Sequence, residues 1–306
     1  MSPARRWVIG RGLLGEAVAR ARPDAPYRAA IRWADPTTAA TDLAHAVEAF
    51  VATPGPLEIY WCAGRGVTST PREALFTEVE VFESFLRALA ACPSEVRDRL
   101  VLFVATSVGG AYGAIPGAPH RESGPTAPSS AYGEAKLAME RAATAYAGTH
   151  GWRTVIGRLT NLYGPGQDLA KGQGLISTLI DSAVTAQPAR IYVALDTLRD
   201  YIFEDDAAAV ISAAASRAAG LAPGSTVVKI VGTGRAVSVG AIIGELRRLR
   251  RRAGFALVAQ SGAAGQSPDL RVESEVWTDL DALVGTSLPE GLDRVLRARL
   301  DQLARG

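Results

Sequence analysis

The sequence predicts an α/β fold in which helices cover both faces of a doubly wound parallel β-sheet. Apolar runs of strand length alternate with helical stretches through the first two thirds of the chain, and this order favours parallel strands joined by helical crossovers. The runs are apolar at nearly every position, which is typical of strands buried on both faces. The predicted strands are 6–9, 27–33, 57–62, 100–105, 153–156 and 226–231. The predicted helices are 14–22, 41–53, 71–91, 130–149 and 207–219.

Glycines occupy three fixed positions directly after the first predicted strand. Gly10, Gly12 and Gly15 form G-x-G-x-x-G between a strand and a helix, where backbone amides and a helix N-terminus can receive a pyrophosphate. The motif alone is weak evidence in a chain with 31 glycines, but its place in the first strand–helix turn favours a dinucleotide site. The residues assigned to this site are Gly10, Arg11, Gly12, Leu13, Leu14 and Gly15.

Tyr132 and Lys136 stand four residues apart in a predicted helix. The chain has three lysines beside thirty arginines, and random placement would give a tyrosine and a lysine this spacing in about 0.08 of such chains. Positions four apart share a helix face, so the ammonium can lie beside the phenol and favour the phenolate. The pair indicates acid/base chemistry; the alternative is an ordinary aromatic residue and an exposed lysine.

Composition and charge exclude several classes of function. The net charge is +2, so no nucleic-acid partner is expected, and the basic run 247–252 is interpreted as a solvated helix end. Cys62 and Cys92 make no disulfide framework, and the three histidines have no metal-site spacing. No apolar run is long enough to cross a membrane. We therefore expect a cytoplasmic protein with neither a metal nor a membrane partner.

Further motifs follow in order along the chain. They are Thr106 to Gly113 (TSVGGAYG), Pro128 to Glu140 (PSSAYGEAKLAME), Arg158 to Gln167 (RLTNLYGPGQ), Arg199 to Ala208 (RDYIFEDDAA) and Leu288 to Leu292 (LPEGL). With the glycine loop, these motifs make the chain resemble the extended short-chain dehydrogenase/reductase family over roughly residues 6–300. Within that family it most resembles the NAD-dependent epimerase/dehydratase group, which acts on nucleotide sugars.

The resemblance implies a Rossmann-like doubly wound sheet with a smaller C-terminal substrate-binding lobe. Residues 1–160 and about 199–235 are expected to form the NAD(P)-binding domain, and 161–198 and about 236–306 the smaller lobe. Relatives often pair through two helices, so a homodimer through 71–91 and 130–149 is expected.

The resemblance also assigns roles to the central motifs. It makes Tyr132 the acid/base and Lys136 the residue that binds the nicotinamide ribose, with Ala63 and Gly64 beside the cofactor. A hydroxyl should polarise the substrate oxygen. The family's usual spacing places that hydroxyl at Val108, so Ser107 serves if the glycine turn absorbs one residue. Thr106 is the other candidate, and it is also open that neither hydroxyl acts.

Three residues are substrate-binding candidates. Asn161 and Arg199 match positions that contact the substrate or its diphosphate in the group, and arginine's donor fork suits a diphosphate. The alternative is that Arg199 and Asp200 only join the two lobes through an ion pair. Arg271 is a weaker diphosphate candidate and could equally be a surface arginine.

The cofactor is NAD or NADP, and the sequence does not decide between them. An acidic residue after the second strand would hold the ribose hydroxyls of NAD, whereas arginine accommodates the phosphate of NADP. Arg32, and Arg11 inside the glycine loop, favour NADP. Asp35 or Asp42 could instead match the family's aspartate beside the adenine, which favours NAD.

The expected reaction is epimerisation of a nucleotide sugar through transient oxidation of a hydroxyl by hydride transfer to nicotinamide. Dehydratases of the group carry acidic residues after the active hydroxyl, but here Val108, Gly109, Gly110 and Ala111 follow. An NADPH-dependent sugar ketoreductase is the alternative, and a nucleotide-binding protein without turnover is an alternative of another class. The sequence identifies neither the sugar nor its nucleobase.

Overall fold

Six parallel strands form the main sheet of the computed structural model, which describes residues 4–24, 26–169, 174–191, 193–250, 257–259 and 267–305. Their order across the sheet is β2-β1-β3-β4-β5-β9, and every neighbouring pair is parallel. The carboxyl ends of all six strands therefore meet at one edge, which confirms the predicted Rossmann-like α/β class. The strands are β1 (Arg5–Ile9), β2 (Pro26–Tyr27), β3 (Leu57–Trp61), β4 (Leu100–Ser107), β5 (Arg153–Leu159) and β9 (Thr226–Val231).

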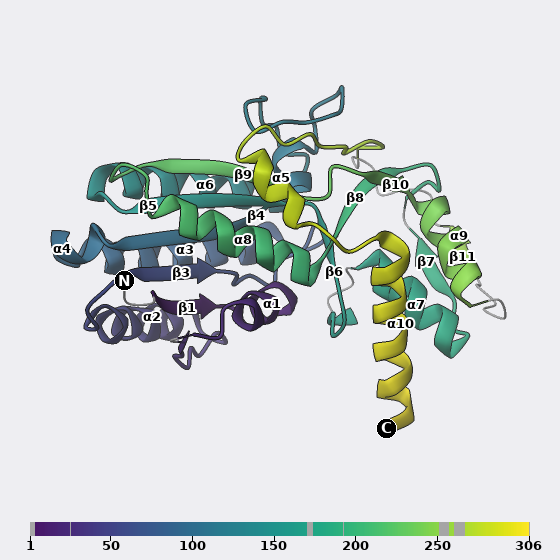
Figure 1. Cartoon of the computed structure of the whole chain (residues 1–306), viewed down its shortest axis with the longest axis horizontal. Helices are drawn as coiled ribbons and strands as arrows, with labels where there is room; N and C mark the ends of the chain where they lie inside the picture. The colour runs from purple at the N-terminus through teal and green to yellow at the C-terminus, as the bar shows by residue number, and fades with distance from the viewer. Residues whose placement is uncertain are drawn as a thin grey trace.

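Helices cover both faces of this sheet (Figure 1). On one face α2 (Pro36–Val51), α3 (Arg72–Ala90) and α6 (Ala131–His150) enclose a core rich in aromatic side chains. On the other face α1 (Leu13–Ala21), α8 (Glu204–Ala218) and the short η2 (Thr278–Leu283) pack over alternate residues of the same strands. Burying each large apolar side chain contributes about 1.5–3 kcal/mol, so these two layers hold the strand ends in place. Two short helices, α4 (Ser94–Arg97) and α5 (Val108–Tyr112), flank β4.

The second strand is much shorter than predicted. The sequence predicts a strand over 27–33, but β2 contains only Pro26 and Tyr27. Helix α2 then begins at Pro36, because Asp35 accepts a hydrogen bond from the backbone N–H of Thr38 and Pro36 is pre-organised for a first helical turn. The predicted start at residue 41 is therefore wrong by five residues.

A second core lies beside the carboxyl edge of the main sheet (Figure 1). It joins the sheet β10-β8-β6 and the parallel pair β11-β7 to three helices. Strand β8 belongs to this small sheet, although residues 199–203 were expected in the larger domain. The elements are β6 (Asn161–Tyr163), α7 (Leu175–Thr185), β7 (Ala189–Ile191), β8 (Leu198–Phe203), β10 (Ala236–Ser238), α9 (Val239–Leu249), β11 (Leu257–Ala259) and α10 (Leu288–Arg305).

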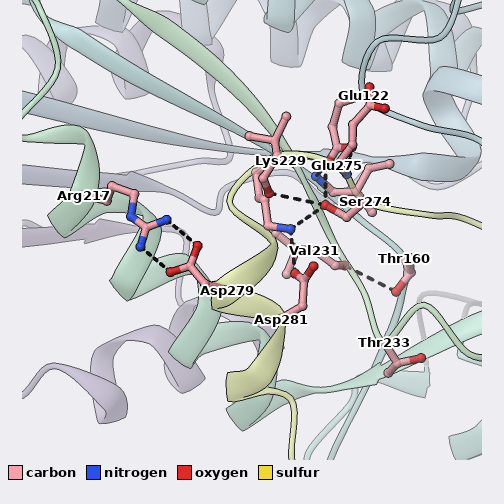
Figure 2. Close-up of polar contacts among 12 residues, drawn as sticks. Glu122, Thr160, Arg217, Lys229, Val231, Thr233, Ser274, Glu275, Asp279 and Asp281 are labelled. Carbon is pink, nitrogen blue, oxygen red and sulfur yellow. Dashed lines mark hydrogen bonds and ion pairs between the residues drawn. The ribbon is translucent and has the colours of Figure 1, made fainter.

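The segment 267–283 links the small sheet to the outer strand of the main sheet. Figure 2 shows its polar anchor: Lys229 of β9 is fully buried, and its Nζ donates to Ser274 Oγ and Asp281 Oδ1, each at 2.6 Å. Ser274 Oγ in turn donates to Glu122 Oε1 at 2.6 Å. A buried ammonium needs such partners, because its desolvation would otherwise be very costly. The sequence analysis did not find this anchor.

A buried ion pair joins α6 to β5. Arg158 Nη2 and Glu140 Oε2 are 2.7 Å apart, and both side chains are 7 % exposed. Thr106 Oγ1 of β4 donates to Glu140 Oε1 at 2.8 Å, and Arg158 Nη1 donates to the Tyr112 hydroxyl at 2.7 Å. The network therefore holds α6 in register with two central strands.

Glu140→Gln is expected to lower the free energy of unfolding by about 3–5 kcal/mol, because it leaves the Arg158 guanidinium buried without a counter-charge. Urea denaturation measures the loss. The double variant Glu140→Leu/Arg158→Met is expected to recover most of it, since no buried charge remains. A single variant within about 1 kcal/mol of the parent would contradict the network's role.

Helices α1 and α8 are joined through the acidic first turn of α8. Arg20 Nη2 lies 3.0 Å from Glu204 Oε1 and 2.9 Å from Asp205 Oδ1. Acidic residues are favourable at a helix N-terminus, yet Glu204 is almost fully buried. Burial raises the pKa of its carboxyl to about 7, although Arg20 opposes the shift.

Glu204→Gln is expected to remove a pH-dependent loss of stability. The folded pKa lies above the ordinary value of 4.5, so ionisation costs nothing below pH 4.5 and destabilises the fold increasingly up to about pH 7. Ionisation of Glu204 lowers the free energy of unfolding by about 3 kcal/mol in full, and this loss persists at higher pH. Urea unfolding of parent and variant at a series of pH values should therefore show the variant's relative stability rising toward pH 8. A constant difference would contradict the raised pKa.

Candidate active site

One cavity of about 950 Å³ follows the carboxyl edge of the main sheet. Its walls include the loop after β1, the residues after β3, the end of β4, the start of α6 and, from the small-sheet side, residues 160–168. Parallel α/β sheets bind ligands at this edge. The cavity also brings together most of the predicted cofactor and catalytic residues.

The glycine loop has the shape that a pyrophosphate needs. Gly10 has a φ of +87°, and a Cβ there would lie 2.4 Å from the Ala63 backbone; a Cβ on Gly15 would lie 1.9 Å from the Gly10 carbonyl oxygen. A Cβ on Gly12, in contrast, would meet nothing within 4 Å, and Gly12 caps α1 without a side-chain hydrogen bond. Open space and helix N–H groups therefore coincide at Gly12, which fits a dinucleotide phosphate.

The other predicted cofactor residues divide into two groups. Arg11, Leu13, Leu14, Ala63 and Gly64 line the cavity. The Arg11 guanidinium is held by both carboxylate oxygens of Glu16, at 2.7 and 2.8 Å.

Arg32 and Asp35 do not line the cavity, contrary to their assignment as cofactor-binding residues. The Arg32 guanidinium donates to both carboxylate oxygens of Asp42, at 2.7 and 3.0 Å, and Asp35 is used as the cap of α2. Both lie after the short β2, where the backbone has already left the sheet. Trp33, between them, is the residue that lines the cavity.

Tyr132 and Lys136 lie on the first two turns of α6 and both line the cavity. The helix begins where Ser130 Oγ accepts a hydrogen bond from the Gly133 N–H. Lys136 Nζ lies 5.6 Å from the centre of the Tyr132 ring, on the same face of the helix. Gly64 provides room for the ammonium, because a Cβ there would lie 3.3 Å from Nζ.

Two glycines allow α5 and α6 to come unusually close. A Cβ on Gly133 would lie 2.5 Å from the Gly110 carbonyl oxygen, and a Cβ on Gly110 would lie 3.3 Å from Gly133 Cα. Any larger side chain at Gly133 would force the helices apart. The contact places Ser107, at the start of α5, beside the first turn of α6.

Both candidate hydroxyls line the cavity, and they differ in their hydrogen bonds. Ser107 ends β4, lines the cavity and accepts a hydrogen bond from the Gly110 N–H at 3.2 Å, so its own proton is available. Thr106 Oγ1 instead uses its proton on Glu140 or on the Gly157 carbonyl. Val108 is buried and lies outside the cavity wall.

Glu78 is a cavity residue that the sequence analysis missed. Its Oε1 accepts hydrogen bonds from the backbone N–H groups of Arg65 and Gly66, at 2.8 and 2.9 Å. Its Oε2 lies 3.2 Å from the position of a Cβ on Gly64, which Lys136 approaches from another side. Glu78 therefore holds the loop after β3, although it lies more than ten residues further along the chain. No local sequence pattern indicates this contact.

Of the three substrate candidates, only Asn161 lines the cavity. Its Nδ2 donates to the Asp200 carbonyl at 2.9 Å. The Arg199 guanidinium points to the carbonyls of Leu198 and Ser267, at 2.8 and 2.7 Å, and Arg271 pairs with Asp269. Neither arginine lines the cavity, and no ion pair joins Arg199 to its neighbour Asp200 among the described contacts.

Within the described residues, no group of three or more histidine, cysteine, aspartate or glutamate side chains is arranged to hold a metal ion. Cys62 and Cys92 are free thiols. None of the helices in the described part of the chain combines the length and apolarity needed to cross a bilayer.

Known proteins match both the sequence and the fold. Over 96 residues the chain is 38% identical to a dTDP-glucose 4,6-dehydratase of Streptomyces niveus; the match covers 31% of this chain and 28% of that enzyme. The fold is similar to that of MoeE5, solved with UDP-glucose and NAD (TM-score 0.79, 21% identity, 98% of this chain and 100% of that one). It is also similar to the UDP-glucose 4-epimerase of Thermotoga maritima (TM-score 0.80, 16% identity, 98% and 100%).

A family model describes the larger part of the chain. The NAD dependent epimerase/dehydratase family matches residues 8–228, which include the glycine loop, Ser107, Tyr132, Lys136 and the whole of α8. The chain therefore belongs to the NAD dependent epimerase/dehydratase family.

Proposed function

We propose that this enzyme is an NAD-dependent nucleotide-sugar epimerase. One observation carries the proposal: a single cavity joins an open glycine loop at the N-terminus of α1 to Tyr132, Lys136 and Ser107. The similar structures add support, because MoeE5 holds UDP-glucose and NAD and the Bacillus cereus UDP-glucuronic acid 4-epimerase holds UDP-glucuronic acid and NAD.

The cofactor would be held at both ends of this cavity by residues described above. The N–H groups that follow Gly12 would bind the pyrophosphate, and the Lys136 ammonium would donate to the nicotinamide ribose. A bound nicotinamide would accept a hydride from a sugar carbon and later return it. Gly64 keeps the ribose end open, since a side chain there would fill the space beside Lys136.

Proton movement is assigned to α6 and β4. The Ser107 hydroxyl donates a hydrogen bond to the oxygen of the reacting sugar hydroxyl and holds it in place. Tyr132 accepts the proton that the sugar hydroxyl loses. Lys136 lies on the same face of α6 as this acceptor, with its Nζ 5.6 Å from the centre of the Tyr132 ring. After the keto sugar has rotated so that its opposite face would accept the returning hydride, Tyr132 gives the proton back to the oxygen and the configuration at that carbon is inverted.

Epimerisation fits the cavity better than dehydration. Elimination of water requires an acid and a base beside the sugar carbons, but α5 after Ser107 contains no carboxylate: Val108, two glycines and Ala111 precede Tyr112, whose hydroxyl donates to the Arg121 carbonyl. Of the four carboxylates that line the cavity, Glu16 pairs with Arg11, Glu204 pairs with Arg20, Glu78 holds the loop after β3, and Asp168 lies on the small-sheet side. An NADPH-dependent ketoreductase would use the same Tyr132 and Ser107, and it remains the alternative.

NAD is favoured over NADP by the position of Arg32. Its guanidinium is held by Asp42 and lies outside the cavity wall, so it does not face the ribose that carries the extra phosphate in NADP. A homodimer through α3 and α6 and a cytoplasmic location stay predictions, as does the division into domains at the expected boundaries.

The nucleotide released from the purified, denatured protein is expected to be NAD. An epimerase regenerates its cofactor in every cycle and has no need to release it. Mass spectrometry of the released material makes the test. A protein that arrives empty and then binds NADPH would favour the ketoreductase, and one that binds neither dinucleotide would contradict both functions.

Tyr132→Phe is expected to lower kcat by at least about a hundredfold and to leave the Kd for NAD unchanged, because it removes the acid/base hydroxyl and keeps the ring. Nuclear magnetic resonance of UDP-glucose and UDP-glucuronic acid turnover gives kcat, and calorimetry gives Kd. Ser107→Ala is expected to lower kcat about tenfold or more.

Thr106→Val is the matched control for Ser107→Ala. It removes the neighbouring hydroxyl, which bonds to Glu140 rather than facing a ligand, so it should lower stability by about 1–2 kcal/mol with little change in kcat. Full activity in Tyr132→Phe, or loss of turnover in Thr106→Val alone, would overturn these assignments.

A further inference from the structure

Trp33 occupies the place where a dinucleotide site usually carries a charged side chain. It lies 18 residues after Gly15, close to the roughly 20-residue spacing at which an acidic residue holds the ribose of NAD or an arginine accommodates the phosphate of NADP. The charged neighbours Arg32 and Asp35 are used elsewhere, on Asp42 and on α2. Trp33 is 44% exposed and lines the cavity. An exposed indole therefore replaces the charged group.

The topology places the adenosine half of a dinucleotide beside Trp33. The pyrophosphate site at Gly12 follows β1, and Tyr132 lies on the β4 side of that strand. A cofactor whose nicotinamide reaches Tyr132 must extend its adenosine in the opposite direction, toward β2 and α2. On that side the cavity wall contains Trp33 together with Pro36 and Ala39 of α2.

The wall at this end of the cavity is apolar and aromatic. The Trp33 ring packs edge-on against Trp61, with 6.3 Å between ring centres and 81° between ring planes, and Val81 of α3 completes the wall. Trp61 is 2% exposed, and its indole N–H is buried without a hydrogen-bond partner among the described residues. The buried Trp61 ring therefore supports the exposed Trp33 ring from behind.

We propose that the adenine ring of the dinucleotide stacks on Trp33 and that Trp61 forms the back wall of this adenine site. The inference rests on the proposed function, since it concerns the cofactor of the same reaction. Aromatic faces bind flat bases without needing a charge. Binding of the adenosine half then depends on the indole ring rather than on a carboxylate–ribose contact.

Calorimetry with cofactor fragments tests this site without measuring turnover. Trp33→Ala is expected to weaken binding of NAD and ADP-ribose about tenfold or more, as loss of a stacked base does elsewhere. Nicotinamide mononucleotide, which has no adenine, should bind the variant as it binds the parent. Trp33→Phe keeps a stacking face and should retain most of the affinity. In the parent, ADP-ribose should also quench tryptophan emission by an amount that is lost in Trp33→Phe.

Leu283→Ala provides the matched control, because Leu283 is an equally exposed apolar residue (44%) on η2, away from the cavity wall. Its affinities should equal those of the parent. Unchanged ADP-ribose binding in Trp33→Ala would overturn the adenine site while leaving the proposed function intact. A parent protein that binds neither NAD nor ADP-ribose would instead remove both.

Discussion

The backbone contact between α5 and α6 is the constraint on which the active site depends. Gly110 and Gly133 are in direct contact with no side chain between them, and a Cβ on Gly133 would lie 2.5 Å from the Gly110 carbonyl oxygen. This approach converts two local features, the end of β4 and the first turn of α6, into one reacting surface. The buried pair of Glu140 and Arg158 holds the same helix against β5 two turns later, so that α6 has little freedom to move away. These contacts restrain the positions of Ser107 and Tyr132 at the cavity wall, as the catalytic roles proposed for them require.

The small-sheet side of the cavity depends on a different set of restraints. Its wall contains residues of β6 and β8 and of the loop between β6 and α7. The segment 267–283 ties the small sheet to the main sheet, with Arg199 bound to the Ser267 carbonyl at one end and Lys229 bound to Asp281 at the other. Arg199 therefore makes this connection through hydrogen bonds to backbone carbonyls, and not through an ion pair with Asp200. Asp200 itself is buried and accepts hydrogen bonds from Thr160 and Thr233.

The features that could be predicted from the sequence are those set by local geometry. Helical periodicity places Tyr132 and Lys136 on one face, and three glycines at fixed spacing define the loop at α1. Arginine orientation could not be predicted, because a long flexible side chain turns to whichever acceptor the fold brings near. In this way Arg32 pairs with Asp42, and Arg271 pairs with Asp269. No sequence motif indicates either pair. Glu78 and the anchor at Lys229 were missed for the related reason that their partners lie far away in the chain.

The two described lysines lie where a compact ammonium suits the space better than arginine's planar fork. Lys229 of β9 is fully buried, and its Nζ donates to both Ser274 and Asp281. Lys136 is partly buried, and a Cβ on Gly64 would lie 3.3 Å from its Nζ. The two sites differ in one respect. Lys229 has a carboxylate partner, whereas among the described contacts the Lys136 ammonium has no ion pair and one hydrogen bond, to the Met139 sulfur at 3.9 Å. A half-buried cation without a counter-charge lowers stability, because its loss of hydration is not offset. Hydroxyl oxygens of a bound cofactor would accept hydrogen bonds from this ammonium.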